Sequence, residues 1–390
     1  MARDSFIEET PFFADEHARL AAGVADFAAR EVAPRETAAE ERGEDEHFRE
    51  MLALLAQADL LRYSVARPAG HEPLDARALC VVREALAYRS AMADLAFVMQ
   101  GLGTYALSLA GSEHVRDFWL ERARTGRAVA AFALTEPEAG SDVSNVQTTA
   151  RREGDGYRID GRKCFISNAG VADFYTVFAR TGSRPDGRAQ LSAFIVGARM
   201  PGFRVRARTR LVAAHPIGEI EFESLRVPEE DRLGEEGDGF RLAMQTMDMF
   251  RASVGAAACG MARRALDEAV RYARGRRQFG AALADHQLVQ EKLARMQTEL
   301  DAARLLVYRA AHLKDVGGTG LTRAASEAKL FATEAAQRIV DEAVQIHGGY
   351  GLVRGSAVER LYRDVRALRI YEGTSEIQKL IIARELLREQ

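Results

Sequence analysis

The spacing of apolar residues changes twice along this chain of 390 residues, and this change restricts the folds that it can adopt. Over residues 15–125, apolar side chains recur at helical spacing, as at Leu20 and Val24. Over residues 129–227 they alternate as in β-strands, and from Gly237 onward the helical spacing returns. We therefore predict an α+β fold, mainly α, in which a helical part, a β part and a second helical part follow one another.

The same two changes predict the domain boundaries. We expect an N-terminal α-helical domain at residues 1–127, a middle β-domain at residues 128–234 and a C-terminal α-helical domain at residues 235–390. The turn sequence Asp155-Gly156 precedes an alternating run, which predicts one strand of the middle domain. A chain of this length is sufficient for two or three domains with large cores.

Composition is that of an ordinary globular protein and excludes several classes of function. Hydrophobic residues make up 47% of the chain, and its net charge of −3 predicts no general attraction to nucleic acid or anionic lipid. Three cysteines without a CxxC pair are too few for a disulfide framework, and the eight histidines lack metal-ligand spacing. No apolar run has membrane-spanning length, and residues 1–10 lack the pattern of a targeting signal. We expect a cytoplasmic protein with no metal ion and no membrane insertion.

A short corner near the C-terminus offers a candidate catalytic base. A helical pattern over residues 358–369 leads into Glu372-Gly373, and Thr374 or Ser375 can cap a further helix. Glu372 would then be held by packing on both sides, where desolvation raises the pKa of a carboxylate and makes it a better base near neutral pH. Taken alone, the same Glu-Gly pair is more typical of a solvated acid at a helix end.

Four motifs, in this order over residues 15–388, resemble those of the acyl-CoA dehydrogenase family. They are Ala131–Asp142 (AFALTEPEAGSD), Arg276–Gly280 (RRQFG), Gln345–Gly351 (QIHGGYG) and Tyr371–Ser375 (YEGTS). One such motif is a weak signal, but four in register are highly specific. The resemblance implies an N-terminal helical domain, a middle β-barrel or sandwich domain and a C-terminal four-helix bundle. It also implies FAD-dependent dehydrogenation of an acyl thioester.

The resemblance assigns an FAD site. Thr135 would lie by the reactive edge of the flavin ring, Ser141 would donate to the pyrophosphate, Phe165 would cover one ring face and Ser167 would bond to the flavin. The complete set of implied cofactor residues is Phe132, Leu134, Thr135, Gly140, Ser141, Phe165, Ile166, Ser167, Arg276, Gln278, Phe279, His286, Gln287, Gln345, Gly348, Gly349, Thr374 and Glu376. Those from residue 276 to 349 contact the neighbouring subunit's cofactor in the family, so a homotetramer is implied. Without the resemblance, the Thr-Glu-Pro and Gly-Ser-Asp sequences are ordinary turn sequences.

The resemblance also implies the reaction and its partners. Glu372 would remove the α-proton while a β-hydride passes to FAD, which gives a trans-2-enoyl thioester, and electron-transferring flavoprotein would accept the electrons. Phe250 stands where some family members carry the base, so Glu372 has no competitor by that comparison. The implied substrate contacts are Ser141, Asp248, Arg251, Tyr371 and Gly373. Asp248 and Arg251 can also be interpreted as a surface ion pair at i,i+3 spacing.

Two segments depart from the family pattern and leave the substrate open. Residues 63–75 lack a Pro-Glu-x-x-Gly-Gly loop, and residues 210–219 replace a polar Ser-Asp-Thr stretch. We favour a short- or medium-chain acyl-CoA, with a branched or cyclic acyl-CoA or an acyl carrier protein as alternatives. A flavin oxidase on the same scaffold, which would release peroxide in air, is a further alternative. A nucleic-acid-binding member is disfavoured by the net charge of −3.

One glycine-rich pattern resembles a dinucleotide-binding motif but lacks the structural context that such a motif needs. The stretch from Gly101 to Ala106 (GLGTYA) matches the Gly-x-Gly-x-x-Ala pattern of dinucleotide-binding folds, but it follows a helical stretch and not a strand. We expect its small residues to permit close helix packing or to line the acyl pocket.

Overall fold

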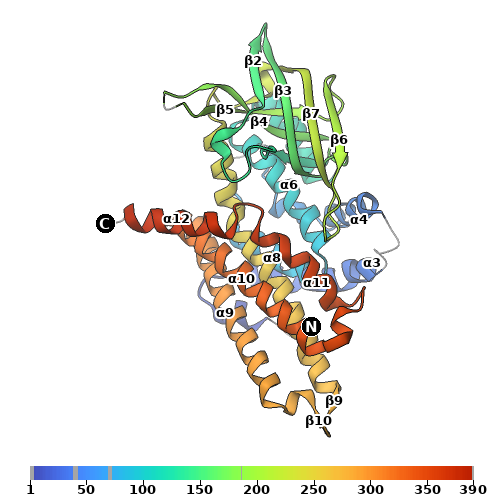
Figure 1. Ribbon diagram of the computed structural model, residues 1–390. Helices are drawn as coiled ribbons and strands as arrows, with labels where there is room; N and C mark the ends of the chain where they lie inside the picture. The colour runs from blue at the N-terminus through green and yellow to red at the C-terminus, as the bar shows by residue number, and fades with distance from the viewer. Residues whose placement is uncertain (1–3, 38–42, 69–72, 186, 389–390) are drawn as a thin grey trace. The chain divides into compact units, whose positions relative to one another are not determined.

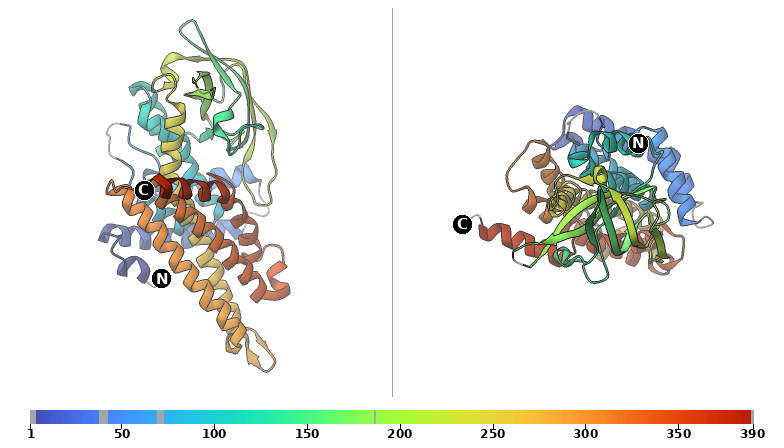
Figure 2. Two further views of the ribbon diagram at one scale, coloured as in Figure 1. Left: turned by 60° about the vertical axis from the view of Figure 1, so that its left-hand side comes forward. Right: turned by 90° about the horizontal axis from the view of Figure 1, so that it is seen from above.

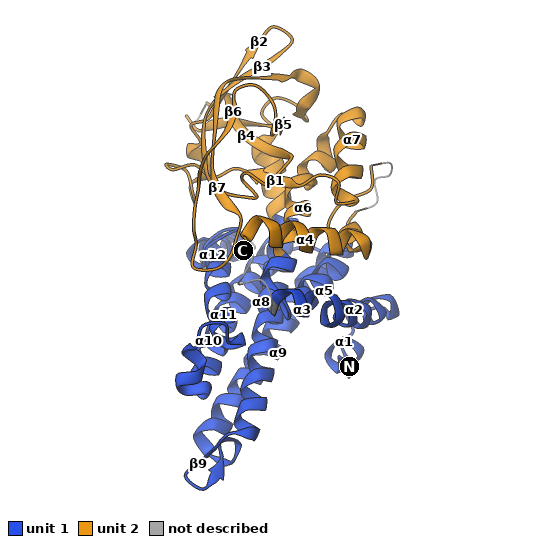
Figure 3. Ribbon diagram, turned by 90° about the vertical axis from the view of Figure 1, so that its right-hand side faces the viewer, with its two compact units in different colours: residues 1–42, 75–94, 248–390 blue, residues 43–74, 95–247 orange. Residues whose placement is uncertain are grey.

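The computed structural model of the chain contains two compact units (Figure 3). The residues that the structure describes are 4–37, 43–68, 73–185 and 187–388. Unit 1 comprises residues 1–42, 75–94 and 248–390, and unit 2 comprises residues 43–74 and 95–247. Unit 1 therefore combines N-terminal with C-terminal helices, and unit 2 combines N-terminal helices with the β segment.

Helices occupy both ends of the described chain, as predicted (Figure 1). The first set is α1 (Ser5–Glu9), α2 (Asp15–Phe27), α3 (Ala33–Thr37), α4 (Glu44–Gln57), α5 (Ala76–Ala87), α6 (Ala91–Ala110) and α7 (Glu113–Arg124). The second set is α8 (Gly239–Gly275), α9 (Gln287–Asp315), α10 (Leu321–His347), α11 (Ala357–Val365) and α12 (Ser375–Arg388). Among these described helices, none combines the length and apolar character that a membrane span requires.

Unit 2 contains a sheet of eight strands. They are β1 (Ala130–Ala133), β2 (Thr149–Glu153), β3 (Gly156–Ser167), β4 (Phe174–Ser183), β5 (Ala189–Gly197), β6 (Phe203–Arg208), β7 (Ile217–Pro228) and β8 (Arg232–Leu233). The order is β6-β7-β3-β2-β4-β5-β8, and β1 pairs with β4 in parallel. The strand predicted after Asp155-Gly156 is β3, whereas the sequence did not single out β2 or β6. Those two strands expose most of their residues, so their apolar alternation is weak.

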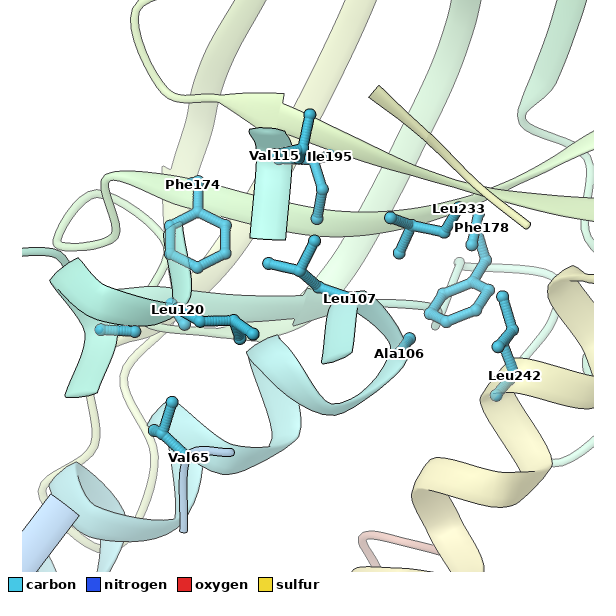
Figure 4. Close-up of a cluster of buried hydrophobic side chains, with 14 of the residues drawn as sticks. Val65, Ala106, Leu107, Val115, Leu120, Phe174, Phe178, Ile195, Leu233 and Leu242 are labelled. Carbon is cyan, nitrogen blue, oxygen red and sulfur yellow. The ribbon is translucent and has the colours of Figure 1, made fainter. Parts of the chain in front are cut away.

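Apolar residues of α6, α7 and the sheet form the core of unit 2 (Figure 4). Leu107 and Leu120 from the helices pack with Phe174, Phe178 and Ile195 from β4 and β5, and all five are fully buried or nearly so. Ala130 and Phe132 of β1, the strand that leads to the predicted flavin residue Thr135, also pack on this core.

The glycine-rich stretch near residue 103 serves packing. It lies inside α6, and a Cβ at Gly103 would lie only 2.6 Å from the Cβ of Ala130 in β1. The Thr176 hydroxyl donates to the Gly103 carbonyl at 2.7 Å. The absence of a side chain therefore lets the helix approach a strand, whereas we had expected it to approach another helix or the acyl pocket.

Unit 1 is mainly helical, and it also contains the antiparallel strand pair β9 (Arg277–Gln278) and β10 (Ala281–Ala282) (Figure 2). In it, α9 and α10 pack side by side, and α10 also contacts α11 and α12. A 3-10 turn at Arg366–Arg369 follows α11, and α12 begins at Ser375 after five intervening residues. The corner that carries Glu372 therefore lies between two helices, as predicted.

The two atypical segments differ in how far the structure describes them. Within the first, residues 69–72 lie outside the described residues. The second, residues 210–219, forms an irregular loop that leads into β7 at Ile217.

Candidate active site

The backbone at Glu372 is held in an unusual conformation. Its φ is +53°, in the left-handed region that non-glycine residues rarely adopt, and Gly373 follows with φ of +90°. A Cβ at Gly373 would lie 2.5 Å from Nε2 of Gln378, and the positive φ by itself favours glycine at this position. Strain of this kind persists only where neighbouring groups hold it, and it often marks functional sites.

Two buried polar side chains hold this corner by its carbonyl groups. Lys329 in α10 donates from Nζ to the Gly373 carbonyl at 2.7 Å. Gln378 in α12 donates to the same carbonyl at 2.9 Å and to the Glu372 carbonyl at 3.2 Å. Both side chains are completely buried, and Thr374 adds a helix cap by accepting from the Ile377 N–H. The position of the Glu372 backbone is therefore fixed from two helices.

The carboxylate of Glu372 is desolvated and incompletely bonded. Its Oε2 atom is buried and has no hydrogen-bond partner among the described residues. Burial raises the pKa of Glu372 above its usual value, while the charges of Arg83, Lys329 and Arg251 oppose the rise. Burial lowers the pKa of Lys329 to about 8, against the attraction of Glu372. The result is a carboxylate whose proton affinity is increased but whose charge has partners nearby.

The structure does not support the interpretation of Asp248 and Arg251 as a surface ion pair. The two lie on α8 with Nη1 of Arg251 donating to Oδ1 of Asp248 at 3.0 Å. However, the Arg251 side chain is only 6% exposed, and its Nε is buried without a hydrogen-bond partner among the described residues. It is therefore a buried cation beside Glu372 and not a solvated surface charge.

A second buried pair lies near the corner. Arg83 in α5 donates from Nε and Nη2 to both oxygens of Asp94 at 2.8 and 2.7 Å, and from Nη1 to the Ser253 hydroxyl. Burial raises the pKa of the neighbouring Tyr371 hydroxyl, which Arg83 opposes. Glu376 lies at the exposed start of α12, so it is set apart from this buried group.

In unit 2, residues 134–136, which follow β1, are held to the C-terminal part of β3 by hydrogen bonds. The backbone N–H of Cys164 donates to the Thr135 carbonyl at 3.0 Å. Nζ of Lys163 donates to the Leu134 carbonyl at 3.1 Å and to Oε1 of Glu136 at 2.8 Å. The side chains of Lys163 and Glu136 are 0% and 3% exposed, so this ion pair is enclosed in protein.

Glu136 differs from Glu372 in having partners at both oxygens. The backbone N–H groups of Gln147 and Thr148 donate to its Oε2 and Oε1, in addition to Lys163. Although burial opposes ionisation, Lys163 and these hydrogen bonds hold the pKa of Glu136 below its usual value. Glu136 thus joins the two ends of the loop that contains the predicted pyrophosphate residues.

The predicted flavin residues of unit 2 separate into exposed and buried groups. Phe165 is 60% exposed with φ of +52°, Gly140 and Ser141 are exposed, and Thr135 and Ser167 are partly exposed. The others face the interior: Leu134 and Ile166 are buried, and Phe132 packs on Phe178 with ring centroids 4.9 Å apart.

The remaining predicted residues gather at the end of the long helices of unit 1. A cavity of about 500 Å³ is lined by Arg276, Gln278, Gly348 and Gly349 together with Tyr272 and His347. Four predicted residues lie outside its lining: Phe279, His286, Gln287 and Gln345. His286 contacts the Gln278 carbonyl through Nε2 at 3.3 Å, and the Phe279 ring is 96% exposed.

Several residues of these sites were missed by sequence reasoning. They are Arg83, Asp94, Glu136, Lys163, His215, Lys329 and Gln378. A signal was present for Lys329, because it shares the buried face of α10 with Ala325, Ala332 and Ala336 at helical spacing. Lysine is rare here, with five in the chain, so a lysine on an apolar helix face was informative.

Comparison with known proteins places the chain in a family. Family models described as the N-terminal, middle and C-terminal domains of acyl-CoA dehydrogenase match residues 14–127, 131–225 and 237–387. Cyclohexane-1-carbonyl-CoA dehydrogenase of Geobacter metallireducens is 39% identical over 97% of this chain and 99% of its own length. The chain belongs to the acyl-CoA dehydrogenase family.

Two further similarities cover nearly the whole chain. The caffeyl-CoA reductase-Etf complex subunit CarC of Acetobacterium woodii is 37% identical over 97% of this chain and 100% of its own. The solved structure of butyryl-CoA dehydrogenase from Megasphaera elsdenii is 34% identical with a TM-score of 0.88, over 96% of this chain and 99% of that one. This acyl-CoA dehydrogenase is therefore an FAD-dependent enzyme that acts on acyl thioesters.

The residues present fit FAD. An aromatic ring that remains 60% exposed, at Phe165, offers a face for a flavin ring. Gly140 has open space where a side chain would lie, which permits a phosphate to approach the backbone. In unit 1, the cavity beside Arg276 and the exposed Gly348-Gly349 backbone suits an anionic or nucleotide group.

Proposed function

We propose that this acyl-CoA dehydrogenase uses Glu372 as the base that removes the α-proton of an acyl thioester. The observation that carries the proposal is the buried Oε2 of Glu372, which accepts no hydrogen bond from any residue that the structure describes. Desolvation strengthens such a carboxylate as a base, and the missing partner leaves one oxygen free to receive a proton. When bound, FAD supplies the acceptor for the β-hydride.

The surrounding residues then have separate tasks. Lys329 and Gln378 hold the corner, so that the oxygen and the Glu372 backbone N–H keep one position relative to a substrate. The backbone N–H would donate to the thioester carbonyl, where charge develops as the proton leaves. Tyr371, Gly373, Asp248 and Arg251 would line the thioester, and buried positive charge at Arg251 favours the enolate-like state.

We assign the cofactor contacts within each unit separately. In unit 2 we assign ring contacts to Thr135, Phe165 and Ser167 and phosphate contacts to Gly140 and Ser141, which would also reach the substrate. Phe132, Leu134 and Ile166 support these groups from the interior. In unit 1 we assign the nucleotide end to Arg276, Gln278, Phe279, His286, Gln287, Gln345, Gly348 and Gly349, with Thr374 and Glu376 near the corner.

We infer a short- or medium-chain acyl-CoA as the substrate, with a cyclic or aryl-substituted acyl-CoA as the alternative. Butyryl-CoA dehydrogenase supports the first, and the cyclohexane-1-carbonyl-CoA and caffeyl-CoA enzymes support the second. The atypical segments at 63–75 and 210–219 are where the pocket of this chain would differ from that of its relatives.

We also infer an electron-transferring flavoprotein as the acceptor and a homotetramer as the assembly. The first is supported by the Etf complex that the name of the Acetobacterium relative records. The second is supported by the exposure of Phe279 and of Gly348-Gly349, which would be covered if each subunit contributes to its neighbour's cofactor site.

The test is anaerobic titration of the FAD-loaded enzyme with a panel of acyl-CoAs, read by bleaching of the flavin absorbance. Butyryl-, octanoyl- and cyclohexane-1-carbonyl-CoA test short-chain, medium-chain and cyclic acyl groups. An acyl carrier protein thioester tests the alternative carrier. We expect stoichiometric bleaching by at least one acyl-CoA. Failure of the whole panel would contradict the proposal, and rapid peroxide release on admitting air would favour an oxidase.

A further inference from the structure

The atypical segment at residues 210–219 contributes a side chain to the end of β3. Strand pairing sets Ser167 opposite Ile217 and Ile166 opposite Gly218, so the residues just before β7 lie beside the last residue of β3. There, Nε2 of His215 lies 2.8 Å from the Ser167 hydroxyl oxygen. Ser167 is the residue to which we assign a hydrogen bond with the flavin.

The position of His215 is fixed from its neighbour. The backbone N–H of Asn168 donates to the Pro216 carbonyl at 2.6 Å, and the Asn168 side chain donates to the Ala130 carbonyl at 2.9 Å. Asn168 is completely buried, so it ties the segment to the sheet directly after Ser167. Hydrogen bonds from Asn168 therefore hold the backbone next to His215 in place, so the contact between His215 and Ser167 does not depend on a free loop.

The imidazole of His215 is neutral under ordinary conditions. Burial lowers the pKa of His215 to about 4, so one ring nitrogen carries a hydrogen and the other is an acceptor. A serine hydroxyl has one hydrogen to donate and can accept others. If Nε2 donates to Ser167, the serine keeps its own hydrogen for a second partner.

We propose that His215 is a positioning residue for the cofactor: its Nε2–H donates to Ser167 and directs the serine hydroxyl hydrogen toward the bound flavin. The inference rests on the proposed function, in which Ser167 bonds to FAD. Hydrogen bonds in series polarise one another, so the histidine strengthens the donation by Ser167. A stronger donor stabilises negative charge that reduction brings to the ring.

The consequence is a higher reduction potential for FAD in this chain. The histidine comes from the segment at residues 210–219, which departs from the family pattern. The size expected for one hydrogen bond is about a tenfold change in the equilibrium constant for reduction, which is about 30 mV for a two-electron couple.

The experiment measures the midpoint potential and the FAD dissociation constant of the full-length holoenzyme in five forms. These are wild type, His215→Phe, His215→Gln, Ser167→Ala and the double variant that combines His215→Phe with Ser167→Ala. Phenylalanine retains a ring but cannot bond, whereas the glutamine amide can again donate to Ser167. Circular dichroism and the melting temperature establish that each variant is folded.

We expect His215→Phe to lower the potential by about 30 mV, His215→Gln to restore part of that loss, and the double variant with Ser167→Ala to fall no further than Ser167→Ala alone. An unchanged or raised potential in folded His215→Phe overturns the inference, because the histidine then does not donate. This failure differs from failure of the proposed function, in which the wild-type chain would bind no FAD or no acyl-CoA would bleach it.

Discussion

Two glutamates of this protein, Glu372 in unit 1 and Glu136 in unit 2, hold carboxylate oxygens away from solvent with opposite effects on the pKa of the side chain. Glu136 has donors on both oxygens, including an enclosed lysine, and its pKa lies below the usual value. Glu372 has a buried oxygen with no hydrogen-bond partner in the described part of the chain, and its pKa is raised. The comparison indicates that hydrogen bonds to both oxygens make Glu136 a structural group, whereas the free oxygen of Glu372 supports the proton transfer that we propose for it.

The largest expected effect concerns turnover. Glu372→Gln keeps the size of the side chain but cannot accept a proton, so turnover with the best acyl-CoA should fall about a thousandfold while FAD remains bound. Glu385→Gln is the matched control, because Glu385 lies on α12 and pairs with Arg388 at the surface. Turnover of Glu372→Gln near the wild-type rate would remove the distinction between the two glutamates.

The next effect concerns stability at the other glutamate. Lys163→Met leaves Glu136 buried without its cation, and we expect the free energy of unfolding to fall by about 3–5 kcal/mol, measured by urea titration. Lys292→Met, which removes a partly exposed pair with Glu342, should cost about 1 kcal/mol or less. Equal losses in the two variants would show that the enclosed pair has no special role.

A smaller effect tests the cations around Glu372. Lys329 opposes the rise in the pKa of Glu372, so Lys329→Met should raise that pKa further. Because the ionised form is the base, activity should then be lost at a higher pH as the solution is acidified. Flavin reduction measured across pH should show this shift of the acidic limb, whereas Lys379→Met, at an exposed position of α12, should not. Coincident profiles for Lys329→Met and wild type would contradict this role.

The smallest expected effect concerns how the free energy of unfolding changes with pH. The raised pKa of Glu372 means that wild type loses stability as pH rises above the usual 4.5 and through the raised value. The lowered pKa of Glu136 means that wild type loses stability as pH falls below 4.5. Unfolding titrations should therefore show Glu372→Gln gaining on wild type as pH rises and Glu136→Gln gaining on it as pH falls. The same sign in both variants would contradict the comparison.

Much of the fold followed from the sequence, and the reason is local. The spacing of apolar residues predicts the order of helical, β and helical segments. Gly373 and the helix start after it predict the corner at Glu372. The buried lysines were not predicted, because burial of Lys163 depends on Glu136, 27 residues earlier, and that of Lys329 on Gly373, 44 residues later. A local sequence pattern does not predict partners that lie so far away along the chain.

The contact between His215 and Ser167 shows the same limit more clearly. The two are 48 residues apart, and only the pairing of β3 with β7 brings them together. Sequence reasoning marked residues 210–219 as atypical without seeing what the segment would touch.

The central claim is that Glu372 takes the α-proton, and hydrogen exchange at the α-carbon tests it most directly. An acyl-CoA analogue with sulfur at the β-position has an α-proton but no β-hydride to lose, so exchange with D2O reports the first step alone. Followed by NMR with FAD-loaded enzyme, wild type should exchange the α-hydrogen and Glu372→Gln should do so about a thousandfold more slowly. Exchange at the wild-type rate in Glu372→Gln would contradict the account.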